Sequence, residues 1–349
     1  MARKKSSNPS SRFPVTSPAA PELPDAPVRT KYSQVHLEAD RDNARSLTVF
    51  IDNAPSSFID LDNPVNVGFE YMEIMLAALE EFPPGPIRVV HLGAAGCTMA
   101  RAIEHIRPNS RQIGVDIDGE LLEYARSWFD LPRAPRLRLR TGDARAELAR
   151  MRDGSADVII RDVFDGTVTP EHLITLEFTM EALRVLRPGG MYLINCADRP
   201  PLTHARREIA TLWQAQRDFR TELESAGGQV KHEPDVALIS EPALLKGRRY
   251  GNLVLALVKP LLAKDPQDCA QVDATEPEVA RQTEETAIDL DGAQLGRRLR
   301  SLAVPAQIAS GADSLMFARN APVLRDPVPS DPAGEAHSDQ LAQGDLAAT

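Results

Sequence analysis

Two aspartates three residues apart, Asp162 and Asp165, follow a short apolar run and are candidates for chemistry. Two carboxylates at the mouth of one strand can attract a polyamine, which carries a positive charge at each end. One of them could also take the proton from an attacking amine, because a carboxylate can act as a general base. The alternative interpretation is an acidic N-cap and loop cluster ahead of the helix expected near Glu171.

A loop of small residues, Gly93-Ala94-Ala95-Gly96, lies between an apolar run and a helix-like segment. Residues without bulky side chains let a ligand lie close to exposed backbone N–H groups at a helix start. Asp116 follows Gly96 by twenty residues, near the spacing at which an acid reaches the ribose hydroxyls of a bound nucleotide. The pattern predicts a nucleoside-bearing cofactor. Because the full G-x-G-x-x-G fingerprint is absent, an ordinary α/β turn followed by a chance acid stays the alternative.

Two further acids have roles that follow from their positions. Asp116 would accept hydrogen bonds from both ribose hydroxyls, and the alternative is a solvated acid at a strand end. Asp143 follows a strand and opens a helix, so it could accept a hydrogen bond from an adenine amino group or serve as an N-cap. The two roles of Asp143 are compatible.

The elements that must position these acids alternate regularly between Ile87 and about Lys259. Apolar runs predict strands at 87–92, 137–140, 156–161 and 191–196, with one more that ends at Asp116. Helical spacing predicts helices at 69–82, 98–106, 121–129, 144–151, 171–186 and 203–222. This alternation predicts a parallel sheet covered by helices on both faces, with ligands at the carboxyl ends of the strands.

Two later apolar runs, 236–240 and 252–258, are joined by the connection 241–251, which is too short for a crossover helix. We therefore expect this last pair to be antiparallel. Ahead of the main domain, the runs 34–38, 47–52 and 56–61 predict a small antiparallel meander.

Composition and the pattern of apolar runs together divide the chain into six regions. The predicted regions are a disordered tail at 1–30, an N-terminal β region at 31–66, a Rossmann-like nucleoside-cofactor domain at 67–262, an acidic linker at 263–289, a C-terminal helix and docked segment at 290–325, and a disordered tail at 326–349. The tails and the linker are expected from their low content of aromatic residues and their bias toward polar, charged or proline residues.

Charge and cysteine content exclude several classes of function. A net charge of −10 over 349 residues disfavours binding to nucleic acid or anionic lipid. No apolar run reaches the ~20 residues that span a bilayer, and the polar N-terminus resembles no secretory signal. The three cysteines show neither metal-ligand spacing nor a disulfide framework, so we expect a cytoplasmic protein with reduced thiols and no metal.

Several motifs, taken together in order and spacing, resemble the polyamine aminopropyltransferases, the spermidine synthase family. The likeness runs from about Tyr32 to Lys259. The motifs that carry it are Ser33-Gln34, Tyr71-Met72-Glu73, Gly93 to Gly96, Asp116, Gly142-Asp143, Asp162-Val163-Phe164-Asp165, Thr175-Leu176-Glu177-Phe178 and Leu186-Arg187-Pro188-Gly189-Gly190. The resemblance implies an α/β, Rossmann-like class I S-adenosylmethionine methyltransferase fold. Its sheet would be mostly parallel and seven-stranded, with the last strand antiparallel, behind a small antiparallel β region.

The resemblance also implies a reaction and a set of site residues. An amine would attack the propyl carbon next to the sulfonium of decarboxylated S-adenosylmethionine, and methylthioadenosine would leave. Asp162, the first acid of the Asp-x-x-Asp motif, would be the catalytic residue that takes the proton from the amine. The amine substrate would also contact Asp165, Tyr71 and Glu73. The cofactor would contact Gln34, Gly93, Ala95, Gly96, Asp116, Ile117, Asp143 and Ala144. The resemblance suggests a homodimer through the N-terminal strands.

The sequence also departs from the family pattern. Gly96 stands where the family loop has the Asp that holds the amino group of the cofactor's propylamine arm, and Met72 replaces a polar residue. Lys246, Arg248 and Arg249 would repel a polyamine if they pointed into its pocket, whereas a solvated connection between strands leaves them in water.

Three functional hypotheses therefore stay open. The first is a spermidine synthase-like aminopropyltransferase that acts on an amine such as putrescine. The second is an S-adenosylmethionine-dependent methyltransferase on the same fold, for which the loss of the loop Asp at Gly96 is no handicap. The third is a non-catalytic nucleoside-binding homologue. An NAD-dependent dehydrogenase is disfavoured by the incomplete glycine fingerprint and by the expected antiparallel final strands.

Overall fold

The computed structural model describes residues 23–228, 230, 235–261 and 288–328 of the chain. Most of the predicted linker and most of both predicted tails lie outside the described residues. At their inner ends the predicted tails reach too far. Val28 and Arg29 form the short strand β1 (Val28–Arg29), which pairs with β2 (Gln34–Ala39). At the other end the described chain continues to residue 328, and Asp326 forms an ion pair with Arg145.

The main sheet confirms the predicted fold class, with one strand more than the seven expected. Its order is β12-β10-β11-β9-β8-β5-β6-β7. The strands are β5 (Arg88–Leu92), β6 (Arg111–Asp116), β7 (Leu137–Thr141), β8 (Ala156–Arg161), β9 (Leu186–Asp198), β10 (Asp235–Ser240), β11 (Gly251–Val258) and β12 (Gln307–Ser310). The neighbouring strands in the series β9-β8-β5-β6-β7 are parallel to one another. Strand β11 is antiparallel to both β9 and β10, and β12 is antiparallel to β10. The expectation of an antiparallel last pair is confirmed. The eighth strand arises because 307–310 hydrogen-bonds to the otherwise open edge of β10.

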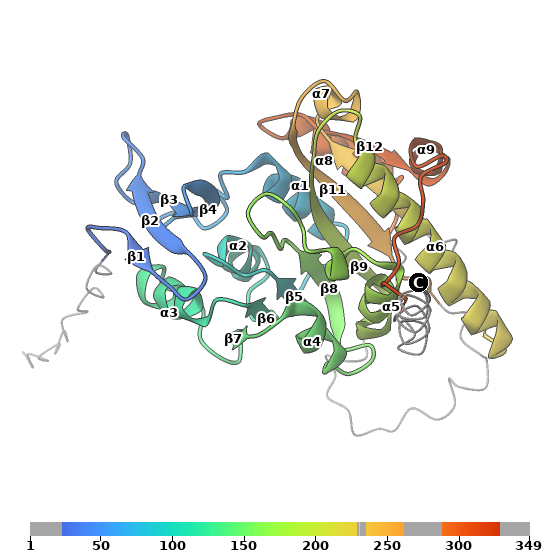
Figure 1. Ribbon diagram of the computed structural model, residues 1–349, viewed down its shortest axis with the longest axis horizontal. Helices are drawn as coiled ribbons and strands as arrows, with labels where there is room; N and C mark the ends of the chain where they lie inside the picture. Colours follow the sequence, from blue (N-terminus) through green and yellow to red (C-terminus); the bar gives the residue numbers. More distant parts are fainter. Residues whose placement is uncertain (1–22, 229, 231–234, 262–287, 329–349) are drawn as a thin grey trace, which may run out of the picture.

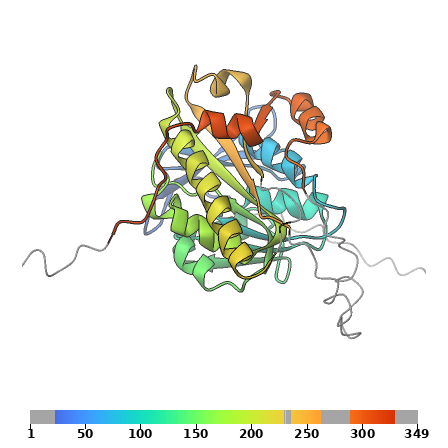
Figure 2. The same cartoon turned by 90° about the vertical axis from the view of Figure 1, so that its right-hand side faces the viewer.

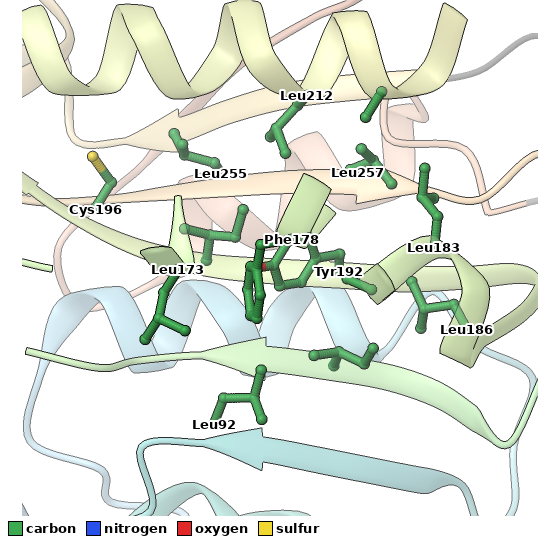
Figure 3. Packing of buried hydrophobic residues seen from close by; sticks show 14 of the residues in the cluster. Leu92, Leu173, Phe178, Leu183, Leu186, Tyr192, Cys196, Leu212, Leu255 and Leu257 are labelled. Atoms are coloured by element: carbon green, nitrogen blue, oxygen red, sulfur yellow. The ribbon is translucent and has the colours of Figure 1, made fainter. Parts of the chain in front are cut away.

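Helices cover both faces of this sheet (Figures 1 and 2). One apolar cluster joins it to α4 (Ala144–Ala149), α5 (Leu176–Val185) and α6 (Thr203–Ser225). The other joins it to α1 (Glu70–Leu79), α2 (Thr98–Ile106) and α8 (Ala293–Ser301). In the first cluster, Leu212 of α6 points toward Leu255 and Leu257 of β11, and Phe178 lies next to Tyr192 (Figure 3). Each buried side chain of this size contributes roughly 1.5–3 kcal/mol to folding, so both helical layers hold the sheet in one position.

A separate four-stranded antiparallel sheet precedes the main domain in the order β1-β2-β3-β4, with β3 (Ser46–Ile51) and β4 (Ala54–Asp60). It confirms the predicted meander. Its apolar face packs on α2 and α3 (Gly119–Trp128). Polar contacts fix the same interface, since the Thr98 hydroxyl donates to the Phe58 carbonyl at 2.9 Å and the Arg101 guanidinium donates to the Asp60 carbonyl at 2.8 Å. The small sheet therefore covers the start of α2, next to the glycine loop.

The C-terminal part of the described chain lies along the main domain. Arg298 of α8 forms ion pairs with Glu80 and Glu81 at the end of α1. Helix α9 (Gly311–Phe317) lies against α6, where the Trp213 indole donates to the Ser314 hydroxyl at 3.0 Å. Beyond α9, residues 321–328 pass along α6 toward α5 (Figure 1). We call residues 321–328 the C-terminal strap.

Candidate functional site

The glycine loop and three of the predicted acids meet at the carboxyl edge of the parallel strands. Asp116 is the last residue of β6, Asp162 follows β8 directly, and Asp143 follows β7. Backbone hydrogen bonds set this arrangement: the Gly93 N–H donates to the Val115 carbonyl at 2.9 Å, and the Asp162 N–H donates to the Leu92 carbonyl at 2.8 Å. Because neighbouring parallel strands end side by side, these acids, although far apart in the sequence, lie at one edge of the sheet.

Asp162 is held by two side chains from opposite directions. The Tyr71 hydroxyl, from α1, donates to its Oδ2 at 2.8 Å, and the Asn195 amide, from β9, donates to its Oδ1 at 2.8 Å. Burial raises the pKa of Asp162, and the hydrogen bonds from Asn195 and Tyr71 offset part of that rise. Burial and the charge of Asp162 also raise the pKa of Tyr71 well above its usual value, so Tyr71 stays a hydroxyl donor. A fixed carboxylate with a raised pKa has the properties of a general base.

Asn195 is a site residue that the sequence reasoning missed. Its side chain is 2% exposed, and its Oδ1 has no hydrogen-bond partner among the described residues. A buried acceptor without a partner costs free energy, which points to a ligand donor as its partner. The signal was an amide inside the buried apolar run 191–196, at a strand register directly next to β8.

The two other predicted amine contacts are Asp165, in the loop after β8, and Glu73, on α1. Asp165 is exposed in a tight turn, where its N–H donates to the Val168 carbonyl at 2.8 Å. Glu73 is half-buried on α1, and burial, with a smaller effect from the charge of Glu70, raises its pKa. No hydrogen bond joins either one to Asp162 within the described chain. The N-cap interpretation of the aspartate pair is wrong, because Thr175 caps α5 by accepting from the Phe178 N–H at 3.2 Å.

The glycine loop is tight on both sides. Gly93 has φ +82°, and a Cβ there would lie 2.1 Å from the Asp162 carbonyl oxygen. At Gly96 a Cβ would lie 2.8 Å from the Cβ of Ser57, and the Gly96 N–H donates to the Ser57 hydroxyl at 3.2 Å. The absence of an acid at position 96 therefore has a structural cause: β4 fills the space that its side chain would need.

Asp116 is already engaged by the loop that it faces. Its Oδ2 accepts the N–H groups of Ala94 at 3.1 Å and Ala95 at 2.9 Å, and its Oδ1 accepts the Asp118 N–H at 3.0 Å. Burial raises its pKa despite these bonds. A carboxylate has about four acceptor positions, so one of them, on Oδ1, stays free. The solvated-acid interpretation is wrong. The prediction was that Asp116 accepts hydrogen bonds from two ribose hydroxyls, but the described chain leaves only one acceptor position free, on Oδ1. The neighbouring residue, Ile117, is 50% exposed.

Asp143 serves as the N-cap of α4, as predicted, through a hydrogen bond from the Ala146 N–H to Oδ1 at 2.9 Å. Its Oδ2 lies 2.8 Å from Nε2 of His172, a residue that the sequence reasoning missed. Partial burial raises the pKa of Asp143, but the Ala146 hydrogen bond and the His172 contact lower it below its usual value. Any adenine amino group must share this carboxylate with His172.

The two last predicted cofactor contacts flank the acids. Ala144 is the first residue of α4 and is buried. Gln34 is exposed at the start of β2, and its neighbour Ser33 donates to Asp118 at 3.2 Å, which brings the small sheet next to the end of β6. Ser33 and Gln34 thus lie near the turn that carries Ile117.

The three cations after β10 are exposed to solvent. Arg249 forms an ion pair with Glu241, and Lys246 and Arg248 are exposed. This agrees with the interpretation of a solvated connection. The short helix α7 (Pro242–Leu245) occupies the start of that connection.

Other site types receive no support from the part of the chain that is described. No group of three histidine, cysteine or acidic residues there could hold a metal ion. None of the described helices is long and apolar enough to cross a membrane. Cys97 and Cys196 are free and buried, and burial raises the pKa of Cys97 to about 12, so neither offers a thiolate. A pocket of about 740 Å³ is lined by residues of β7, of the connection that leads from α3 to β7, and by Arg126 of α3. None of the candidate site residues lines it.

Comparisons with known proteins relate the chain to a methyltransferase-domain family model and to spermidine synthases. Residues 90–194 match a family model described as a methyltransferase domain. The crystal structure of a probable spermidine synthase from Corynebacterium glutamicum has 32% identity and a TM-score of 0.69, and the match covers 90% of this chain and 99% of that one. Among curated proteins, a polyamine aminopropyltransferase from Vibrio vulnificus is 33% identical over 129 residues, which are 36% of this chain and 43% of that protein.

A third relative is named for a different activity. A probable S-adenosylmethionine-dependent methyltransferase from Mycolicibacterium smegmatis is 29% identical over 180 residues, which are 50% of this chain and 65% of that protein. The matched stretches span 43%, 58% and 64% of three curated aminopropyltransferases, so part of each relative has no counterpart in these matches.

Proposed function

The chain belongs to the spermidine synthase family of polyamine aminopropyltransferases, and we propose that it transfers an aminopropyl group from decarboxylated S-adenosylmethionine to an amine such as putrescine. The single observation that carries the proposal is the arrangement of Tyr71, Asp162 and Asn195. It presents a carboxylate with a raised pKa at the carboxyl edge of β8, beside the glycine loop. The family membership supports the reaction class, and the hydrogen bonds of Asp162 support its role as the base.

The proposed chemistry needs one proton acceptor and good alignment. The amine nitrogen forms a bond to the propyl carbon while the bond from that carbon to the sulfonium sulfur breaks, and methylthioadenosine leaves. The nitrogen loses one proton, which Asp162 accepts and later passes to water. Because the sulfonium is already a good leaving group, the protein contributes mainly orientation and a neutral amine. Tyr71 and Asn195 fix the orientation of the carboxylate, and the free Oδ1 of Asn195 is a second acceptor for the substrate amine.

The proposed nucleoside half uses the acids of the neighbouring strands. Asp116 would accept one ribose hydroxyl at its free position, and Ile117 would lie against a face of the base. Asp143 would accept the adenine amino group. Asp165 and Glu73 would act on the amine at longer range, by attracting its positive charge to the mouth of the site. The predicted homodimer through the N-terminal strands belongs to the same proposal.

A methyltransferase is the second candidate, and Gly96 is the observation that favours it. A decarboxylated cofactor carries a positive propylamine arm, and the loop position that holds this arm in the family has no carboxylate here and no room for one. Intact S-adenosylmethionine carries a carboxylate next to that amine, so its arm has less need of a protein acid.

Product analysis decides between these reactions. The wild-type protein is incubated with putrescine and either decarboxylated or intact S-adenosylmethionine, and the products are separated by mass. We expect spermidine and methylthioadenosine from the decarboxylated donor only. A methylated amine from intact S-adenosylmethionine would establish the second candidate. Titration calorimetry with both donors and methylthioadenosine gives binding separately from turnover, so a protein that binds but transfers nothing identifies the non-catalytic homologue.

A further inference from the structure

His172 lies against the carboxylate that the nucleobase would use. Its Nε2 is 2.8 Å from Asp143 Oδ2. Because an ionised carboxylate only accepts hydrogen bonds, Nε2 carries the proton and donates it. The other oxygen of Asp143 is used by the Ala146 N–H, so the rotation of the carboxylate is fixed at both ends. The lone pair that stays free on Oδ2 therefore has a defined direction.

Two arginines hold the segment that carries His172. This segment is the short 3-10 helix η1 (Glu171–Leu173). Arg145 donates to the His172 carbonyl at 3.1 Å, and Arg161 donates to the Leu173 carbonyl at 2.8 Å. Arg161 is 1% exposed and also forms a buried ion pair with Glu208 at 2.7 Å. The backbone of His172 is thus placed by the core of the domain, although its side chain is exposed.

The C-terminal strap holds Arg145 in turn. Both terminal nitrogens of Arg145 pair with the two carboxylate oxygens of Asp326. The strap itself is fixed, because the Asp326 N–H donates to Glu177 at 2.8 Å and the Leu324 carbonyl accepts the Leu176 N–H at 2.8 Å. A bidentate Arg–carboxylate pair fixes direction as well as distance. The strap therefore connects to the nucleobase side of the site through Arg145 and His172.

We propose that His172 is a positioning residue that sets the nucleobase selectivity of this site, and that Asp326 of the C-terminal strap holds His172 in place through Arg145. This inference rests on the proposed nucleoside site. A 6-amino purine presents an N–H to the free lone pair of Asp143, whereas a 6-oxo purine presents an oxygen that the carboxylate repels. With His172 removed, the carboxylate gains freedom and water can bridge it to either base. Selectivity then falls even where the fold is unchanged.

Titration calorimetry with methylthioadenosine and its 6-oxo analogue methylthioinosine tests the proposal. We expect His172→Ala to lower the ratio of the two affinities about fivefold, because the side chains of His172 and Asp143 are 46% and 40% exposed and an exposed charged contact is worth up to about 1 kcal/mol. We expect His172→Gln, which keeps an N–H donor, to restore most of the ratio, and Asp326→Ala to lower it about twofold. The matched control is Asp313→Ala, because Asp313 is exposed on α9 and has no hydrogen bond or ion pair with the described residues. It should bind as the wild type does.

The outcomes separate this inference from the proposed reaction. A wild-type ratio in His172→Ala overturns the role of His172, and equal ratios in Asp326→Ala and Asp313→Ala overturn the role of the strap. If His172→Ala fails to fold, Asp326→Ala still tests the same link. A wild-type protein that binds neither nucleoside overturns the nucleoside site and this inference together. The expected shifts in ratio, in a protein that makes no spermidine, would overturn the proposed reaction alone.

Discussion

The nucleoside half and the amine half of the site use their acids differently. Asp116 and Asp143 accept backbone N–H groups, from the glycine loop and from the start of α4, so they stabilise the fold whether or not a ligand is bound. Asp162 accepts only side-chain donors, from Tyr71 and Asn195. The acids of the nucleoside half therefore stabilise the backbone and are also available to a ligand. The acid of the amine half makes no hydrogen bond through its side chain to the backbone of the described residues, so the fold depends on it less. Mutations in the two halves should therefore separate stability from turnover.

Gly93, where the glycine loop comes closest to Asp162, should show the largest effect. Gly93→Ala places a Cβ 2.1 Å from the Asp162 carbonyl oxygen, at a residue whose φ is +82°. Because the atom it meets belongs to the backbone directly after β8, a side-chain movement cannot relieve the clash. We expect a loss of about 3 kcal/mol or more in the free energy of unfolding, measured by urea denaturation. The control is Gly166→Ala, where φ is +60° but nothing lies within 4 Å of the added Cβ. It should cost about 1–2 kcal/mol, from the left-handed backbone alone. Equal losses would show that the close approach of the loop to β8 is unimportant.

In the amine half, Asp162→Asn should cost turnover and little else. Removing a general base lowers kcat roughly 10²- to 10⁴-fold. The amide keeps an oxygen for the Tyr71 hydroxyl, and Asn195 can turn its own amide so that its unpartnered Oδ1 accepts the new NH₂ group. We therefore expect the free energy of unfolding to change by less than about 1 kcal/mol. The measurement pairs a rate assay for methylthioadenosine release with denaturation. Turnover equal to that of Asp313→Asn, the matched exposed control, would remove Asp162 from the proposed mechanism.

In the nucleoside half, Asp116→Asn should do the reverse. An asparagine oxygen can still accept from Ala94 and Ala95, but its NH₂ group then faces the Asp118 N–H, donor against donor. Leaving such buried groups unsatisfied costs about 1–3 kcal/mol, so the free energy of unfolding should fall by that amount. Methylthioadenosine should also bind more weakly, by titration calorimetry. Unchanged stability would mean that Asp116 acts on the ligand only, and the contrast between the two halves would be lost.

The contrast also explains what the sequence could predict. Asp116, Asp143 and Asp162 could be located because each follows an apolar run and parallel strands end at one edge of a sheet. The side chains that contact these acids left weaker signals, because their positions depend on strand register and on the placement of a short helix. Asn195 meets Asp162 only through the register of β9 on β8. His172 meets Asp143 only because a buried arginine holds η1.

Two parts of the fold were hidden for the same reason. Strand β12 has four residues, and only the open edge of β10 makes it a strand. Asp326 lay in a stretch whose composition indicated disorder, and it pairs with Arg145, which is 181 residues away in the chain. Single residues that bind at long range do not alter periodicity or composition, so no local pattern could reveal them.

The smallest expected effect is in the pH dependence of stability, which should have opposite signs in the two halves. Burial raises the pKa of Asp162 above that of the unfolded chain, so the native state binds its proton more tightly, and the contribution of Asp162 to stability falls as the pH rises from the ordinary carboxyl pKa of 3.8 to the raised value. The pKa of Asp143 is lowered, mainly by its hydrogen bonds against the effect of burial, so its contribution is complete above 3.8 and is lost as the pH falls below it. Urea denaturation of Asp162→Asn and Asp143→Asn between pH 3 and 7 compares them with the wild type. The stability of Asp162→Asn relative to the wild type should increase with pH, whereas the deficit of Asp143→Asn should shrink toward acid; parallel curves would mean that the two acids do not differ in their environment.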